Sequence, residues 1–453
     1  MSKKTDFHLF PYSIFTRTYL ELRLTWSRLS SEIVCMFTLI SILLFQAPTA
    51  MANVSVKEAY QAALKRNEDV ANQVELVNQA EERYKQAMGA IAPSLNFLGS
   101  YTKQDNGSTA AAIYPTDQQT YRINATQPLF RGFREYAALK QQGILSSSAK
   151  FNQDQAMIQL YQDVVTSYFN VVSAEQDYQN LLNEIKVNQD RLKDIQEFKR
   201  IGRSRDTDVL TIESNIAQLE TQVESAKTLI KTTRAIFAFL TDLPNTETLT
   251  DTRIKTASVE DMKSFTAKIS DRPDVQAATT NVDAADRGVS IARGGHLPSI
   301  DLGANYYFDR PGALSNVKWD ATLGLTFPIF QGGVIQSGVR VAASQLKQAD
   351  LGLSKARRLA EEQIETFYEN VVGDLRQIQK QKNAVDISQK SYAAEKRDYK
   401  LGLVTNLDVL QSLTASQESQ RQLDRLLYQY QTDVLKLSSA VIPYGTLLRE
   451  VSE

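Results

Sequence analysis

The sequence FKRIGRSRDTDVL at 198–210 returns as DYKLGLVTNLDVL at 398–410, 200 residues further along the chain. Other segments repeat at nearly the same distance: QPLFRGF at 127–133 and FPIFQGG at 327–333, PSL at 93–95 and PSI at 298–300, NEDV at 67–70 and RPDV at 272–275. Repetition over so long a period means that each half of the chain folds into the same supersecondary unit. The sequence therefore predicts an internally duplicated architecture.

The N-terminal residues have the order of an export signal. Basic residues from Lys3 to Arg28 precede an apolar run at 33–45, which is followed by Ala50-Met51-Ala52. This order predicts a signal peptide over residues 1–52, cleaved after Ala52; a retained N-terminal anchor is the alternative.

Composition excludes several classes of function. The formal net charge is −1, which offers no electrostatic support for a nucleic-acid partner. Cleavage would remove His8 and Cys35, the only cysteine, and would leave His296 as the only histidine. A zinc site, a disulfide or a Cys-His catalytic pair is therefore not expected, and we predict neither a cofactor nor an enzyme.

Each half contains a long stretch without proline, at 133–201 and at 334–401. A helix of such length spans roughly 100 Å and must pack lengthwise against other helices. Apolar residues recur every seven positions in both stretches, which predicts coiled-coil packing. They are Val164, Val171, Tyr178, Ile185 and Leu192 in the first, and Ile364, Val371, Ile378, Val385, Tyr392 and Tyr399 in the second.

The repeats predict matching elements in each half. The first repeat, 53–250, is expected to hold a helix, a hairpin at 95–127, the long helix at 133–201 and a helix at 207–240. A linker at 251–269 follows. The second repeat, 270–445, is expected to hold a helix, a hairpin at 300–327, the long helix at 334–401 and a helix at 406–441, before a tail at 446–453.

The turns after the long helices also match. Gly202 and Gly402 are expected as left-handed helix caps. Asp206 and Asn406 are predicted as N-caps of the helices that follow.

Asp208 and Asp408 come two residues after those predicted caps, where the helix dipole favours an anion. Helix capping alone would explain both aspartates, and it is compatible with a role in binding.

The hairpins alternate apolar and polar residues, most plainly from Trp319 to Phe327 and from Ile300 to Asp309. Segments of about ten residues with one apolar face are typical of outer-membrane strands, although a hairpin on a soluble core shows the same alternation. Four strands cannot close a barrel, and an open edge is not tolerated in lipid. In a membrane this chain must therefore oligomerise.

Together these features resemble the TolC family of outer-membrane efflux and secretion ducts over residues 53–445. The resemblance depends on the duplicated helix–hairpin–helix order, the segments that begin at Gln127 and Phe327, and the turn from Tyr399 to Leu410. It implies an α+β membrane protein with four transmembrane strands per protomer. As a homotrimer the protein would form a 12-stranded barrel continuous with a periplasmic α-barrel of long coiled-coil-like helices.

The resemblance implies a passive exit duct of a tripartite efflux or type I secretion system in the outer membrane, with a long periplasmic extension. Its partners would be outer-membrane lipid, a periplasmic adaptor and an inner-membrane ABC or proton-driven transporter. The turn sequences look similar to the type I secretion branch. The alternative is a surface-exposed structural coiled coil of the adhesin-stalk type, which leaves the paired amphipathic strands unexplained.

The resemblance also implies a gate at the helix turns. It places Tyr399 in a hydrogen-bonded latch and Asp408 in a threefold acidic ring, where carboxylates attract cations and raise one another's pKa. The chain departs from the family pattern at Val404, where members carry a basic residue, and at Gln411, where they carry an acidic one.

In the first of the two turns, Arg203 and Arg205 supply charge. These arginines can pair with Asp408 or Asp208.

Overall fold

The computed structural model describes residues 53–105, 116–250 and 259–441. The predicted signal peptide, the predicted tail and the start of the predicted linker, 251–258, lie outside these residues. Within the described ranges, no helix combines the length and apolar character needed to cross a membrane.

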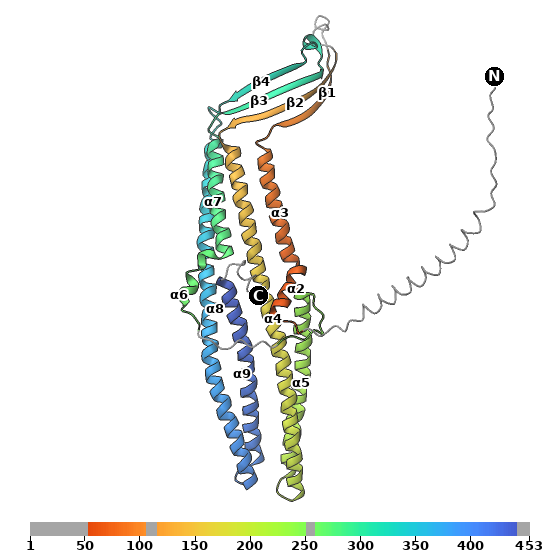
Figure 1. Cartoon of the computed structure of the whole chain (residues 1–453), viewed down its shortest axis with the longest axis vertical. Coiled ribbons are helices and arrows are strands. Elements are labelled where there is room, and N and C mark those ends of the chain that lie inside the picture. Colours follow the sequence, from red (N-terminus) through yellow and green to blue (C-terminus); the bar gives the residue numbers. More distant parts are fainter. Residues whose placement is uncertain (1–52, 106–115, 251–258, 442–453) are drawn as a thin grey trace, which may run out of the picture. The chain divides into compact units, whose positions relative to one another are not determined.

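The elements of the two halves follow the same order (Figure 1). The first half consists of α2 (Val56–Arg66), α3 (Glu68–Gly89), β1 (Ser94–Lys103), β2 (Asp117–Arg131), α4 (Arg134–Arg200) and α5 (Asp206–Thr241). The second consists of α6 (Met262–Thr266), η1 (Ile269–Asp271), α7 (Pro273–Gly294), β3 (Ser299–Asp309), η2 (Gly312–Leu314), β4 (Trp319–Thr326), α8 (Val334–Leu401) and α9 (Asn406–Val441).

The opening helix of the first half is divided in two, and in the second half α6 and η1 likewise precede α7. Asn67 has an extended backbone between α2 and α3, and its side chain accepts a hydrogen bond from the amide of Val70 at 2.9 Å. Asparagine side chains favour this N-cap geometry over a helix interior, so Asn67 ends α2 and begins α3.

The long helices α4 and α8 have 67 and 68 residues, which corresponds to roughly 100 Å each. The shorter α3 and α5 both pack on α4, and α7 and α9 both pack on α8. Two shorter helices therefore follow one another along each long helix (Figure 1).

The helices follow a lateral order within the protomer. Extensive contacts join α4 to α7 and α9, so the order is α3 and α5, then α4, then α7 and α9, then α8. Neither α3 nor α5 has comparable contact with α8. Among the described residues, one side of α8 and one side of the α3 and α5 pair are therefore not covered.

Four residues of the predicted seven-residue row on α8 are buried, Ile364, Val371, Ile378 and Val385, whereas Tyr392 and Tyr399 are half-buried. On α4 the prediction is only partly right, because Tyr178, Ile185 and Leu192 are half-buried. The most buried row there passes through Leu181, Glu184, Asn188, Arg191 and Ile195. Because α4 packs against both α5 and α9, polar side chains on α4 lie between helices and bond across them.

The four strands form one antiparallel sheet in the order β1-β2-β3-β4. The two predicted hairpins are joined by pairing between β2 and β3, where Asn124 lies opposite Asn305. The Asn124 amide donates to Asn305 Oδ1 at 3.0 Å, and the Asn305 amide donates to Asp320 Oδ1 at 2.8 Å. These polar side chains form a bonded row on one face, which agrees with the predicted alternation.

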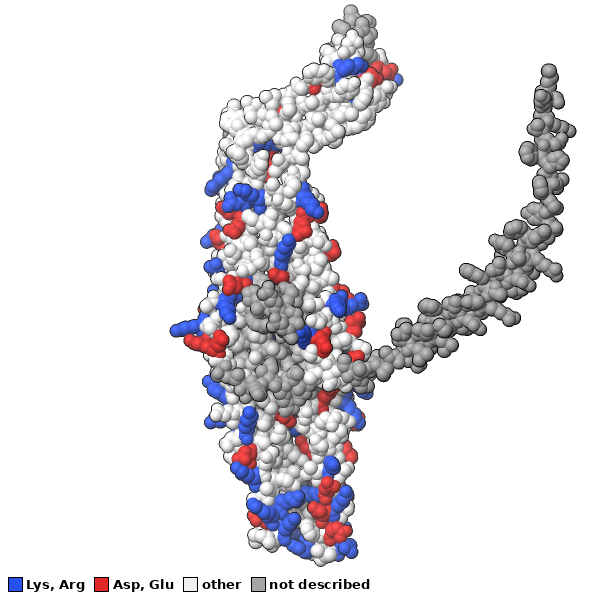
Figure 2. Space-filling view, viewed as in Figure 1, with Lys and Arg blue, Asp and Glu red and all other residues white. Residues whose placement is uncertain are grey.

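The other face of the sheet is apolar and uncovered. Leu95, Phe97, Trp319, Leu323 and Leu325 are each at least 65% exposed. Over the visible face of the sheet, Figure 2 shows almost no charged side chains, whereas charges are dense around the two helix turns. An apolar sheet face of this kind has to be covered by lipid or by another protein.

Candidate gate at the two helix turns

The first turn, residues 201–205, joins α4 to α5, and the second turn, residues 402–405, joins α8 to α9. Gly202 and Gly402 have φ angles of 77° and 76°, as expected of left-handed caps. In both turns the amide after the glycine bonds back into the long helix: Arg203 N donates to Phe198 O at 2.8 Å, and Leu403 N donates to Asp398 O at 3.0 Å. The repeated sequence therefore builds the same turn twice.

The prediction that Asp206 and Asn406 are N-caps is wrong. Each is the first residue inside its helix, and the caps are the preceding residues, Arg205 and Thr405. Thr405 forms a reciprocal capping box, which a residue already inside the helix cannot do. Asp206 instead pairs with Lys199 at 2.5 Å, and Asn406 is almost fully buried.

Asp408 completes the cap of α9. Its Oδ2 accepts hydrogen bonds from the amide of Thr405 at 2.8 Å and from the Thr405 hydroxyl at 2.6 Å. These bonds favour the ionised form and hold the pKa of Asp408 below its ordinary value. Asp208 has the same role in α5, where its Oδ2 accepts from Arg205 N at 2.9 Å and Ser204 Oγ at 3.0 Å.

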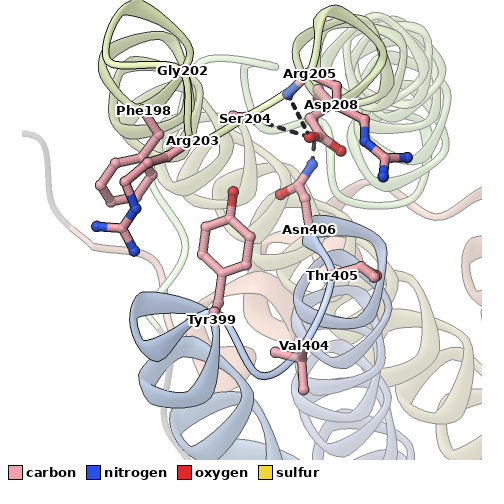
Figure 3. Close-up of a pocket in the computed structure, with 11 residues that line it drawn as sticks. Phe198, Gly202, Arg203, Ser204, Arg205, Asp208, Tyr399, Val404, Thr405 and Asn406 are labelled. Carbon is pink, nitrogen blue, oxygen red and sulfur yellow. Dashed lines mark hydrogen bonds between the residues drawn. The ribbon is translucent and has the colours of Figure 1, made fainter.

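The two turns meet around a pocket of about 410 Å³ (Figure 3). Four of the six predicted gate residues line it, namely Tyr399, Asp208, Arg203 and Arg205. Asp408 and Gln411 do not, and Gln411 is exposed on α9. The structure therefore brings together most of the predicted gate residues but leaves Asp408, the predicted ring residue, and Gln411 outside the pocket.

Tyr399 provides apolar contact between the turns. It packs against the cluster of Ile195, Val209 and Ile212 at the end of α4 and α5, and its ring centroid is 6.0 Å from that of Phe198. Beside it, Arg203 lies over the Phe198 ring and donates to the backbone oxygen of Lys400 at 3.0 Å. Tyr399, which was predicted to take part in a hydrogen-bonded latch, thus contacts the first turn within the same chain.

Arg191 of α4 is the residue that the sequence did not indicate. Its Nη2 donates to Asn406 Oδ1 at 2.5 Å and to Asn406 O at 3.4 Å, and its guanidinium lies 5.6 Å from the centre of the Tyr399 ring. Asn406 Nδ2 in turn donates to the backbone oxygen of Asp208 at 3.3 Å. Arg191 is charged and therefore belongs to no apolar seven-residue row, so no sequence pattern indicates it. The T-x-x-D pattern that begins at Thr405, by contrast, is a recognisable capping signal.

A second polar cluster links α4 and α9 further from the turns. Arg421 donates to both carboxylate oxygens of Asp177, at 3.0 and 3.4 Å, and lies 3.9 Å from Glu184. Burial raises the pKa of Glu184 to about 7, against the attraction of Arg421. The cluster fixes the two halves of the chain to each other.

The described residues contain no group of three or more His, Cys, Asp or Glu side chains placed to hold a metal ion. His296 lies exposed between α7 and β3.

Comparison with known proteins identifies the family. The model of the family described as outer membrane efflux protein matches residues 59–240 and 267–441, most of the chain. The chain is 23% identical to outer membrane protein TolC of Escherichia coli over 417 residues, 87% of this chain and 82% of that protein. It is 23% identical to the proteases secretion protein PrtF of Dickeya chrysanthemi over 75% of this chain and 78% of that protein.

Solved structures share the fold. The outer membrane protein VceC of Vibrio cholerae superposes with a TM-score of 0.76 at 17% identity, over 85% of this chain and 95% of that one. These matches confirm the resemblance inferred from the repeated segments, and with it the location in the outer membrane. The chain belongs to the outer membrane efflux protein family.

Proposed function

We propose that three copies of this chain form an outer-membrane exit duct for an efflux or type I secretion system, closed at its helix turns until partners dock. The partners would be a periplasmic adaptor and an inner-membrane transporter, either an ABC or a proton-driven one. The duct is a passive conduit, so the proposal assigns no catalytic step to any residue.

One observation carries the proposal: two opposite sides of the protomer have strand edges and helix surfaces without a partner, and these sides can pair with each other between copies. The outer edges of β1 and β4 have no strand partner among the described residues, and α8 is not covered on the side away from α7 and α9. Pairing of β4 with β1 of another copy would satisfy the open edges, and would bring α8 beside the other copy's α3 and α5. The apolar sheet face would then face lipid.

Charge substitutions on the two faces of β4 test this assembly. Leu323→Arg places a cation on the apolar face, where we expect a cost of about 2–4 kcal/mol in the membrane and a loss of detergent-extracted trimer. Thr322→Arg, on the opposite face, is the matched control and should assemble. Light scattering of the detergent-extracted protein gives the mass, and planar bilayers give the conductance. A non-conducting monomer for the unmodified chain would refute the proposal.

We also propose that Asp408 supplies the acidic ring at the constriction. Its bonds to Thr405 keep it ionised, and capping does not remove its charge. Asp408→Ala should therefore weaken the block of single-channel current by multivalent cations. Thr405→Val removes the hydroxyl from the same cap but retains the carboxylate, so block should persist. If both variants lose block equally, capping alone explains Asp408.

A further inference from the structure

We propose that Arg122 and Arg310 form an anion-binding site on the polar face of the sheet, suited to carboxylate and phosphate groups. The inference rests on the proposed function for its setting, because in the assembled duct that face would line the lumen. The site itself lies within one protomer, so binding can be measured separately from conduction.

The two arginines come from different halves of the chain. Arg122 lies on β2, and Arg310 follows directly after β3. Arg122 pairs in register with Tyr307 of β3, so the joint between the two hairpins brings both cations to one place. The site lies toward the end of the sheet that is farther from the helices (Figure 1).

One aromatic ring holds both guanidinium groups. Tyr307 is 6% exposed, and its ring centroid lies 5.9 Å from the guanidinium carbon of Arg122 and 4.3 Å from that of Arg310. Contact with an aromatic ring restrains a planar guanidinium and leaves the donors at its edge directed away from the ring. Both side chains are therefore ordered before an anion arrives, which reduces the entropy lost on binding.

The positive charge of the site is only partly neutralised. Arg310 lies 3.5 Å from a carboxylate oxygen of Asp320, which also accepts a hydrogen bond from Asn305 at 2.8 Å. Among the described residues, Arg122 has no carboxylate within 4 Å, and its side chain makes one long hydrogen bond, to the Tyr307 hydroxyl at 3.5 Å. Each protomer therefore keeps one guanidinium whose donors are available to a ligand.

Arg131, on the same strand but next to the helices, shows the structural alternative. Its Nε donates to Asp301 at 2.8 Å, and its Nη1 lies 3.9 Å from Glu135. Two carboxylates compensate Arg131, so its role is to fix β2 to β3. Arg122 lacks such compensation, and its fork of donors matches the oxygens of a carboxylate or phosphate group.

Three copies of the chain would repeat the site around the lumen. The internal repeat does not add to it, because the position 200 residues after Arg122 is Thr322. Rings of arginine in a pore favour anions. We therefore expect the sheet to hold the anionic groups of cargo near the end of the duct that is farther from the helix turns.

Calorimetric titration of the detergent-extracted protein with inorganic pyrophosphate and with citrate, at low salt, tests the site. Arg122→Gln should weaken the binding of either anion about tenfold, because it removes charge-assisted hydrogen bonds. Asp320→Asn should strengthen binding, because it frees Arg310 from its carboxylate partner. A gain of affinity in one variant and a loss in the other cannot both come from misfolding.

Lys103→Gln is the matched control. Lys103 is exposed on β1 and alternates with the strand onto the side of Phe97 and Tyr101, so the substitution removes the same charge from the other face and should leave binding unchanged. Equal losses in Lys103→Gln and Arg122→Gln would overturn the site. A conducting trimer that binds neither anion would overturn the site and leave the duct. Binding in the expected order by a chain that never conducts would support the site and refute the duct.

Discussion

Gly132 and Gly294 are in close contact through their backbones, where the end of β2 meets the end of α7. A β-carbon on Gly132 would lie 2.2 Å from the carbonyl oxygen of Gly294, and one on Gly294 would lie 2.5 Å from that of Gly132. Gly132 also has a φ angle of 69°, which L side chains rarely adopt. Two halves of the chain therefore meet at a point where no side chain fits.

Gly132→Ala should destabilise the protein by about 3 kcal/mol, because left-handed strain and overpacking add together. The apparent melting temperature of the purified trimer measures the effect. Gly338→Ala on α8 is the control, since its β-carbon would meet no atom within 4 Å. Equal melting temperatures for the two variants would contradict the close approach.

Asp374 of α8 and Asp433 of α9 are both buried in the helical wall, and Asp374 Oδ2 has no hydrogen-bond partner among the described residues. Burial, together with the nearby carboxylate of Asp433, raises the pKa of Asp374 to about 7. The folded state then binds more protons than the unfolded state, so this pair's contribution to stability should fall as pH rises from about 4 to 7. The raised pKa of Glu184 acts in the same direction.

Asp374→Asn should flatten that pH dependence, and it should raise the melting temperature most at pH 8, where the unmodified Asp374 is ionised. Gln429, which donates to Asp433 at 2.7 Å, remains in place. Asp386→Asn is the control, because Asp386 is exposed and pairs with Lys390. A parallel pH profile for Asp374→Asn and the unmodified protein would show that Asp374 does not titrate in this range.

Arg421→Met should cost on the order of 3 kcal/mol, because it removes the largely buried cation that lies between Asp177 and Glu184. Arg425 also contacts Asp177, at 3.1 Å, but its side chain is 46% exposed. Arg425→Met should therefore cost only about 0–1 kcal/mol. Thermal unfolding of both variants at one pH makes the comparison, and a similar loss in each would refute the special role of Arg421.

Tyr168→Phe tests how the start of the described chain is held. The hydroxyl lies 2.8 and 2.7 Å from the backbone oxygens of Val54 and Thr250 and shares its single hydrogen between them. Its loss should cost about 1 kcal/mol and speed amide exchange near Val54. Tyr136→Phe, at an exposed position on α4, should leave both quantities unchanged. Unaltered exchange in Tyr168→Phe would mean that other contacts hold this segment.

Much of the fold follows from local sequence. The repeats predicted the duplicated order of helices and strands, and the seven-residue row on α8 predicted which face of that helix is buried. Strand alternation predicted the polar row at Asn124 and Asn305. These features depend on periodicity and on neighbouring residues, which a single sequence displays directly.

The candidate site depended more on tertiary structure. Gly202 and Gly402 were predictable because a left-handed helix end selects glycine, and the positions of the turns followed from them. The contact of Arg191 was not predictable, because a charged residue in a long helix is usually solvated. Only the packing of α4 against α9 brings its guanidinium to Asn406. The sequence by itself determined the repeated helices, strands and turns through local conformational preference. The tertiary structure decided which polar side chains meet, because those contacts join residues some 200 positions apart and leave no local pattern.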